Sequence, residues 1–500
     1  MRPLTSLLFL LTFTACTGLK PVDLAPEYTP APADAPLWDA VPAVRPGHWQ
    51  VPLGNGPAAL DWRLRAIDSA TESIDLQTFL WSMDVVGELV LNHLIAAADR
   101  GVLVRILIDD TFLVSEDAML LSLQEHPNIE YRVFNPYKRR SNSFASREIL
   151  NLAEFHRLDH RMHNKAMVVD NRVAIVGGRN LADEYFGLNG QANFRDFELI
   201  IGGPVVLVVS QSFDDYWNDH WSFPIDMLAH VESSKVDLDA ARQRHDIDGQ
   251  VHQEQTEDDR KEQWLELVRG AYTGAPVLFV DNPPAVNPAD ASSAPIQVAN
   301  QLVTLLDSAT EEILIISAYL IPTPHLEDAI ERAGQRGVEV RILTNSIRSN
   351  NHLAAHSAYR NHIDELMDSG AELHEVRIDA RDRERHMFPP TDQKSLALHA
   401  KMLIIDDDKV FIGSANLDPR SLRLNTEMGL LIESNALNAA VRAEVMPDFA
   451  EANAWKLEFN EDGDTVWVSE DMVLTTQPAG SFMQRIEDWM FAHLPIEGEM

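Results

Sequence analysis

A polar pattern occurs twice in this 500-residue chain and limits the folds that it can adopt. Residues 163–180 read HNKAMVVDNRVAIVGGRN, and residues 399–416 read HAKMLIIDDDKVFIGSAN. Four polar positions recur at a constant separation of 236 residues, in the pairs His163 and His399, Lys165 and Lys401, Asp170 and Asp406, and Asn180 and Asn416. The same separation relates residues 99–107 (DRGVLVRIL) to residues 335–343 (QRGVEVRIL). The chain is therefore an internal duplication, with a period far too long for a solenoid.

The apolar residues of each pattern predict two short buried strands joined by a tight polar turn. Side chains alternate along a strand, so His399 and Lys401 are expected on one face. A histidine beside a fixed cation suits attack on a phosphate, because neutral imidazole is a nucleophile near pH 7 and the ammonium offsets charge on a non-bridging oxygen. Asp406 follows His399 at an odd separation and is expected on the opposite face, so its predicted role is structural, such as capping the turn.

Small and polar residues follow the second strand of each pattern. A glycine there lets the backbone approach a ligand closely, and hydroxyl and carboxamide groups donate hydrogen bonds to phosphate oxygens. The candidate phosphate-binding residues are Gly178, Asn180, Ser414 and Asn416.

Paired H-x-K-x-x-x-x-D motifs, each followed by G-[GS]-x-N, resemble the signature of the phospholipase D superfamily. The resemblance covers roughly residues 60–435. The segments most similar to bacterial proteins of the cardiolipin synthase C type are VGGRNLADEYF (176–186), GSANLDPRS (413–421) and LNTEMG (424–429). This resemblance implies an α/β fold of two tandem repeats, each a mixed β-sheet flanked by helices, that pack face to face around one shared active site. Alternating helix-like and strand-like segments in residues 60–108 agree with an α/β fold.

The resemblance also implies roles for single residues. The implied catalytic set is His163, Lys165, Asp170, His399, Lys401 and Asp406. One histidine forms a phosphohistidine while the other acts as general acid and then as base. Family habit makes His163 the nucleophile, and the sequence itself leaves that choice open.

An acidic residue soon after each motif is implied to orient a histidine, because Asp170 and Asp406 are expected to face away. These acids are Asp196 and Glu427, each at the start of a predicted strand. Their separation is 231 residues rather than 236, which implies a longer loop in the first repeat. A solvated charge at a strand edge is the alternative for Asp196.

The N-terminus predicts export of the protein. Residues 1–16 read MRPLTSLLFLLTFTAC, in which one arginine leads an apolar run too short to span a bilayer. The FTAC segment resembles the end of a bacterial lipoprotein signal, after which a lipidated Cys16 would become the first residue. The expectation is a membrane-anchored lipoprotein of the bacterial cell envelope that faces the periplasm. A signal anchor, or simple secretion with an unmodified Cys16, is the alternative.

The remaining sequence suggests six segments. They are a lipoprotein signal peptide (1–15), a Pro- and Ala-rich tether (16–56), a first phospholipase D-like repeat (57–222), a polar linker (223–263), a second repeat (264–434) and a C-terminal tail (435–500). The phosphodiesterase regions around the motifs extend over about 157–184 and 393–420. In the tail, an apolar stripe at helical spacing is expected to pack into the core rather than to lie at a membrane interface. Its members are Phe482, Met483, Ile486, Trp489 and Met490.

The charge of the chain bears on its partners. Its net charge is −36, with 77 acidic and 41 basic residues. Enzymes that act on nucleic acids need a basic surface to neutralise the phosphates, so nucleic acid is not an expected partner of this acidic chain. The short basic run YKRR (137–140) meets either lipid phosphates or solvent, and solvent is favoured. No metal and no cofactor are expected, because no histidines or cysteines have convincing zinc-ligand spacing.

Three functions remain in view. The first is a phosphatidyltransferase that makes cardiolipin from phosphatidylglycerol and a second phospholipid. The second is a hydrolytic phospholipase D that shares the covalent step and uses water as acceptor. The third is a catalytically idle membrane lipoprotein, which the intact His, Lys and Asn of both motifs argue against. The motifs specify the phosphoryl centre and leave the acceptor, and any accessory protein, open.

Overall fold

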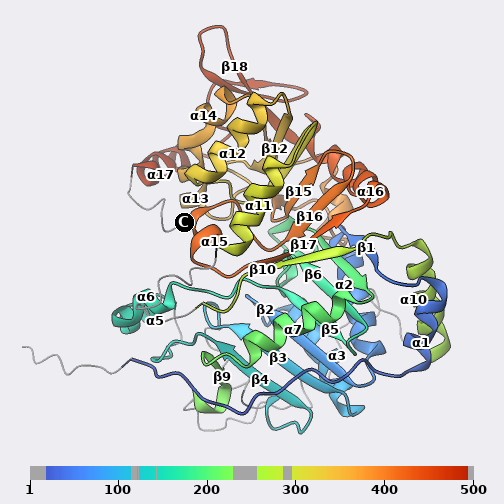
Figure 1. Cartoon of the computed structure of the whole chain (residues 1–500). Coiled ribbons are helices and arrows are strands. Elements are labelled where there is room, and N and C mark those ends of the chain that lie inside the picture. The colour runs from blue at the N-terminus through green and yellow to red at the C-terminus, as the bar shows by residue number, and fades with distance from the viewer. Residues whose placement is uncertain are drawn as a thin grey trace, which may run out of the picture.

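The computed structural model describes residues 18–113, 121, 123–141, 144–228, 256–284 and 296–493. Two lobes are visible in Figure 1, and each is built on a mixed β-sheet with helices packed against it. The predicted α/β fold of two tandem repeats is therefore confirmed.

The sheet of the first lobe has eight strands in the order β1-β8-β6-β5-β2-β3-β4-β9. In that order they are Trp49–Leu53, Glu198–Gly202, Val173–Gly177, Ala166–Val169, Ser73–Thr78, Leu103–Asp109, Ile129–Phe134 and Ser222–Pro224. β2, β3 and β4 are parallel and the other neighbours antiparallel. The main helices of this lobe are α2 (Gly56–Ser69), α3 (Val85–Asp99) and α7 (Val205–Trp217).

The sheet of the second lobe repeats this strand order. Its strands run β10-β17-β16-β15-β11-β12-β13-β18-β19-β20. In that order they are Pro276–Val280, Met428–Glu433, Lys409–Gly413, Lys401–Ile405, Glu312–Ser317, Glu339–Asn345, Glu372–Val376, Ala454–Phe459, Thr465–Val468 and Val473–Leu474. The main helices are α11 (Gln297–Asp307), α12 (Pro324–Gln335), α13 (Leu353–Tyr359), α14 (Ile363–Asp368), α15 (Pro419–Arg423) and α16 (Asn435–Val445). The duplication in sequence is thus a duplication in topology.

The two sheets share a hydrophobic core. Buried side chains of β5 and β6, such as Val168 and Val176, belong to the same cluster as Ile404 and Ile412 of β15 and β16. Strands buried on both faces read as continuous apolar runs, which explains the sequences AMVV and KMLII. One further strand pair crosses between the lobes, because β7 (Ala192–Arg195) pairs in parallel with β14 (Ser395–Leu398). These contacts bring both motifs to one interface.

The structure differs from the predicted tether at residues 16–56. From residue 18 onward the segment lies against the first lobe, and it forms α1 (Pro36–Val44) and β1, which pairs with β8. Buried Trp38 donates its indole N–H to Asp170 Oδ2 at 2.7 Å and packs edge-on against Trp264. Trp38 and Trp49 are both buried. Their large apolar side chains hold the segment against the first lobe, although its composition is rich in Pro and Ala.

The predicted linker and tail boundaries also differ from the structure. α10 (Glu257–Gly270) spans the end of the predicted linker at residue 263, and its Trp264 is buried against the first lobe. The tail from residue 435 continues the second lobe, because α16 covers its sheet and β18 pairs with β13. The rest of the linker, residues 229–255, lies outside the described residues.

The last helix, α17 (Phe482–Ala492), was predicted to bury its apolar stripe in the core, and this prediction is wrong. All five residues of the stripe are exposed, while Asp488 on the opposite side is buried. The helix is held by its polar side because Asp488 finds hydrogen-bond donors on α13 and just after it. Among the described residues, no helix is long and apolar enough to cross a membrane.

Candidate active site

The two motif histidines occupy equivalent places, each just before a central strand of its own sheet. His163 precedes β5, and His399 precedes β15. The residue before each histidine is held by the last residue of a strand two places away in the same sheet, β3 or β12: Met162 N–H donates to Asp109 at 3.0 Å, and Leu398 N–H donates to Asn345 at 2.8 Å. The second motif thus uses a neutral carboxamide where the first uses a carboxylate.

Each histidine takes its acid from the other repeat. His163 Nδ1 lies 2.9 Å from both carboxylate oxygens of Glu427, and His399 Nδ1 lies 2.6 Å from Asp196 Oδ2. All four side chains are buried. A histidine that donates Nδ1–H to a carboxylate keeps a lone pair on Nε2, as a nucleophile or base requires, whereas a histidine that accepts from a protonated acid carries its proton on Nε2, as a general acid requires. The structure therefore brings Asp196 and Glu427 to the histidines.

The motif lysines lie beside the histidines, as strand alternation predicts. Lys165 Nζ donates to the His163 carbonyl at 2.7 Å, and Lys401 Nζ lies 3.0 Å from His399 Nδ1. Both ammonium groups are buried in one shared cluster. They supply positive charge where a phosphodiester would develop negative charge.

Asp170 and Asp406 do not reach the histidines. Each follows its strand with a positive φ, of 53° for Asp170 and 49° for Asp406. The Asp406 carboxylate accepts backbone N–H groups of residues 310–312, and Asp170 accepts those of residues 71–73. These residues belong to two similar sequences, DSATES (68–73) and DSATEE (307–312), which lead into β2 and β11, so both aspartates cap turns.

Gly178 and Ser414 hold the acids rather than present donors to a phosphate, which differs from the prediction. The N–H of Gly178 donates to Phe197 and that of Ser414 to Met428. A Cβ on Gly178 would lie 2.3 Å from Asp196 Oδ1, so only glycine leaves room for this carboxylate. Ser414 Oγ donates instead to Glu427. Gly178 thus makes room for Asp196, and Ser414 binds Glu427, the acid of its own repeat.

Asn180 and Asn416 remain candidates for phosphate contacts. Both side chains are buried, and Asn416 lines the cavity beside His163, where its amide N–H can reach a phosphate oxygen. Asn180 Nδ2 donates to the Tyr185 hydroxyl at 2.8 Å, and the Tyr185 ring packs edge-on against His399. Tyr185 was missed at the sequence level, because an aromatic residue seven positions after Gly178 gives no signal of its own.

The electrostatics keep both histidines neutral. Burial, reinforced by Lys165 and Lys401, lowers the pKa of His163 well below its usual range. Burial and Lys401 lower the pKa of His399 to about 3. Burial also lowers the pKa of Lys165 to about 7 and of Lys401 to about 8.

The two acids differ from each other. Burial raises the pKa of Glu427 to about 8. Burial also raises the pKa of the Asp196 carboxyl. His399, Lys401 and Arg179 outweigh this effect, so the pKa of Asp196 lies below its usual value. The surroundings explain this contrast: Arg179 donates to the Asp196 carbonyl at 2.7 Å, whereas the Glu427 N–H donates to another buried acid, Asp281, at 3.1 Å.

A cavity of about 450 Å³ opens beside His163. Residues of both repeats line it, and many are aromatic or apolar. They include Phe79, Phe112, Tyr137, Phe155, Leu158, Tyr319, Ala355 and Asn416. An ion pair across the lobes closes one side, where Arg420 Nη2 lies 2.8 Å from Asp159 Oδ1. Aromatic walls around a cationic phosphate centre suit an amphipathic phosphodiester.

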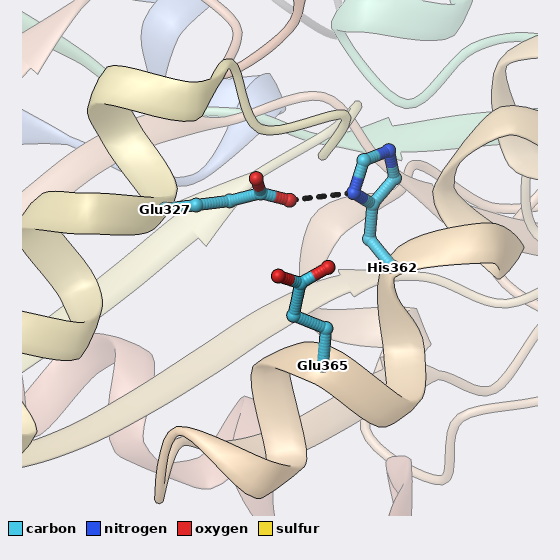
Figure 2. Close-up of side chains that lie close together, drawn as sticks. All are labelled: Glu327, His362 and Glu365. Atoms are coloured by element: carbon cyan, nitrogen blue, oxygen red, sulfur yellow. Dashed lines mark hydrogen bonds and ion pairs between the residues drawn. The ribbon is translucent and has the colours of Figure 1, made fainter.

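One group of possible metal ligands lies elsewhere among the described residues. Glu327, His362 and Glu365 come together on the surface of the second lobe, from α12, the turn before α14, and α14 (Figure 2). His362 Nδ1 lies 2.6 Å from Glu327 Oε1. None of the three lines the cavity at His163. The expectation that catalysis needs no metal stays a prediction.

Fold and site define an enzyme of phosphodiester chemistry whose two half-sites come from a gene duplication. A family model described as "Cardiolipin synthase, PLD-like domain" matches residues 64–217 and 302–448. The chain belongs to this family of the phospholipase D superfamily, as its motifs predicted. It is an enzyme of the phosphatidyltransferase and phospholipase D-like type.

The relatives agree with this family. The chain is 33% identical to cardiolipin synthase C of Escherichia coli K12 over 457 residues, which cover 89% of this chain and 95% of that protein. It is 27% identical to cardiolipin synthase A of Pseudomonas putida GB-1 over 411 residues, covering 82% and 70%. Phosphatidylserine synthase of Haemophilus influenzae Rd KW20 has the same fold, with a TM-score of 0.55, 15% identity and coverage of 84% and 92%.

Proposed function

We propose that the protein makes cardiolipin from phosphatidylglycerol and a second phospholipid through a phosphohistidine. The observation that carries the proposal is the pair of neutral, buried histidines, each bound to an acid of the opposite repeat. The family match and the cardiolipin synthase relatives support the product. Phosphatidylglycerol and phosphatidylethanolamine are the phosphatidyl donors to compare.

The first half of the reaction transfers the phosphatidyl group to the protein. Nε2 of one histidine attacks phosphorus and forms an N–P bond, while the bond from phosphorus to the headgroup oxygen breaks. The other histidine gives its Nε2 proton to that oxygen. Lys165, Lys401 and the two motif asparagines stabilise charge on the non-bridging oxygens.

The second half reverses these roles. A hydroxyl of phosphatidylglycerol attacks the phosphohistidine phosphorus, the N–P bond breaks, and the second histidine accepts the hydroxyl proton. Water would perform the same step and release phosphatidic acid. The aromatic cavity at His163 supports a lipid acceptor, because exclusion of water and a positioned alcohol decide between two chemically similar acceptors.

The location of the protein is part of the proposal. Cys16 lies outside the described residues, and its position at the end of the FTAC segment supports a lipidated N-terminus in the cell envelope, facing the periplasm. A lipid anchor would confine the active site to a surface rich in lipid alcohols. Phospholipids are the proposed partners, and the net charge of −36 argues against nucleic acid.

The test is incubation of the purified protein with vesicles of phosphatidylglycerol, of phosphatidylethanolamine and of both, followed by mass spectrometry of the lipids. Cardiolipin should form in every mixture that contains phosphatidylglycerol. His399→Ala protein is the control for contaminating activity. Phosphatidic acid without cardiolipin in all mixtures would move the assignment to a hydrolytic phospholipase D.

A further inference from the structure

In α17, the last helix of the described residues, the apolar side faces outward and a charged residue faces the protein. The Trp489 side chain of α17 is 54% exposed, and the other apolar residues of its stripe are also exposed. Asp488, in contrast, is 1% exposed and accepts hydrogen bonds from Ser357 Oγ at 2.8 Å and Arg360 Nη1 at 2.9 Å. An apolar stripe that faces outward on a helix fixed by its polar side marks an interaction surface. We call this surface the α17 stripe: Phe482, Met483, Ile486, Trp489 and Met490.

A second apolar surface lies on the first lobe. It covers α5 (Phe144–Asn151), a short 3₁₀ turn (Leu152–Glu154) and α6 (Phe155–Leu158). Its exposed members, here called the α5–α6 ridge, are Ile149, Leu150, Leu152 and Phe155. Ile149 is 75% exposed and Leu152 is 70% exposed, and apolar side chains exposed together in this way mark an interaction surface.

The α17 stripe and the α5–α6 ridge lie on two sides of the same cavity. Phe155 of the ridge lines the cavity at His163. α17 rests on α13, whose Ala355 lines that cavity from the second lobe. Figure 1 shows α17 with α13 on the upper lobe and α5 with α6 on the lower lobe, along one side of the molecule.

Two further observations lie beside the ridge. Lys138 and Arg139 are exposed just before α5, in a chain that is otherwise strongly acidic. The described chain also begins beside the ridge, because the Leu19 N–H donates to Glu154 Oε1 at 2.9 Å.

We propose that the α17 stripe and the α5–α6 ridge form one membrane-docking surface, which inserts into the interfacial layer of a phospholipid bilayer and presents the cavity to lipid. This inference rests on the proposed function, since it assumes that the substrate is a bilayer lipid. Trp and aliphatic side chains with adjacent Lys and Arg are the composition that binds such an interface.

A bilayer fits this surface better than a protein partner does. A protein seated on both patches would cover the cavity between them, which the substrate has to enter. A bilayer that contacts both patches supplies the substrate at that point. The acidic remainder of the chain is repelled by anionic lipid, so the docking orientation follows from the apolar patches and the two cations.

The test starts from Cys16→Ser protein, which has no acyl anchor and no cysteine, because Cys16 is the only one in the chain. Leu152→Cys, Met490→Cys and, as control, Phe459→Cys each receive an environment-sensitive fluorophore. Phe459 is also exposed and apolar but lies in the β18 hairpin. With phosphatidylglycerol–phosphatidylethanolamine vesicles, the first two labels should shift to the blue and the control should not. Equal spectra at all three positions would overturn the proposal.

A second measurement uses polar variants in the same background. Ile149→Ser with Leu152→Ser, and Trp489→Ser with Met490→Ser, should each weaken vesicle co-sedimentation by about 10-fold or more, since each removes two apolar anchors. Phe459→Ser with Val473→Ser, another exposed apolar pair of the hairpin region, should bind like the parent. Unchanged binding of both patch variants would refute the docking surface, as would concentration-dependent self-association that these variants abolish in place of vesicle binding.

Activity separates this proposal from the proposed function. The patch variants should keep the parent's turnover of a dispersed short-chain phosphatidylglycerol and lose about 10-fold on vesicles. An equal loss on both substrates would contradict a docking role. If no variant and no parent turned over any phospholipid, the proposed function would fail, while the label shifts would still decide whether this surface binds a bilayer.

Discussion

Glu427 of the second repeat binds His163 of the first, with both carboxylate oxygens 2.9 Å from Nδ1. In the reciprocal contact, Asp196 of the first repeat binds His399 of the second at 2.6 Å. Neither repeat therefore holds a complete histidine–acid pair of its own. The duplication yields one active site at the lobe interface rather than two, which explains why both motifs are intact.

Glu427→Gln should lower kcat by about 100-fold or more, because a carboxamide cannot take up and release the proton that the His163–Glu427 pair shares. Glu433→Gln is a matched control, since Glu433 is the exposed last residue of β17, the strand that Glu427 directly precedes. Rates of cardiolipin formation on mixed vesicles measure both. Near-parental turnover by Glu427→Gln would exclude an orienting role.

The pH profile should lack an acid limb near the usual histidine pKa. The pKa of His399 is lowered to about 3, so this histidine stays neutral well below pH 6. Three other groups of the site lose their protons as the pH rises: Lys165 has a pKa of about 7, and Lys401 and Glu427 have pKa values of about 8. We expect kcat/KM to be nearly flat from about pH 5 to 6 and to fall above about pH 7, where Lys165 loses its charge first. An acid limb at pH 6–7 would contradict this assignment.

The distribution of protons also bears on which histidine is the nucleophile. The His163–Glu427 pair retains a proton up to about pH 8, as a general acid requires, while the His399–Asp196 pair has none to give. We therefore expect the phosphohistidine at His399, opposite to the family habit that favours His163. A phosphatidyl substrate with a nitrophenol leaving group needs no general acid, so His163→Ala should accumulate the adduct and His399→Ala should form none. Peptide mass spectrometry after acid quench would locate it, and an adduct on His163 would reverse the assignment.

Local patterns in the sequence predicted what depends on local chain geometry. The strand–turn–strand motifs, the pairing of histidine with lysine and the turn-capping position of Asp406 all follow from the period of a β-strand. The duplication predicted the repeated topology. The acids Asp196 and Glu427 were found through the family resemblance, but their exchange between repeats depends on how the lobes pack, which no local pattern contains.

Composition misled the predictions where a few large side chains decide packing. Residues 16–56 are rich in Pro and Ala, yet Trp38 and Trp49 anchor the described part to the first lobe. In α17 the rule that apolar stripes face the core failed, because Asp488 finds Ser357 and Arg360 as partners. Such partners lie 128 or more residues away in the chain, beyond the reach of helical periodicity.

Asp406→Ala should affect stability and leave the chemistry intact. The substitution removes acceptors for the backbone N–H groups of Thr310, Glu311 and Glu312, at a cost of about 1–2 kcal/mol in the free energy of unfolding for this half-exposed turn. Although partial burial opposes it, these N–H groups lower the pKa of the carboxyl, so its contribution is present at neutral pH and is lost as the pH falls through that lowered value.

Urea unfolding would measure the change for Asp406→Ala. Asp407→Ala is the control, because Asp407 is exposed in the same turn. Specific activity of the folded Asp406→Ala protein should remain within about twofold of the parent, since its carboxylate does not contact either histidine. A loss of 100-fold at unchanged stability would make Asp406 part of the chemistry.

Cys16→Ser should remove the lipid anchor without removing the active site. Radiolabelled palmitate should label the parent chain and not the variant, and the mass of the mature parent should show acyl groups on a new N-terminal cysteine. Lipid anchoring by two or more chains is far stronger than interfacial docking alone, so the variant should shift from the membrane to the soluble fraction at high ionic strength. Activity on dispersed short-chain lipid should persist, because the described part of the chain that forms the site begins at residue 18. An unlabelled parent, or a variant with unchanged mass and membrane fraction, would favour a signal anchor or simple secretion instead.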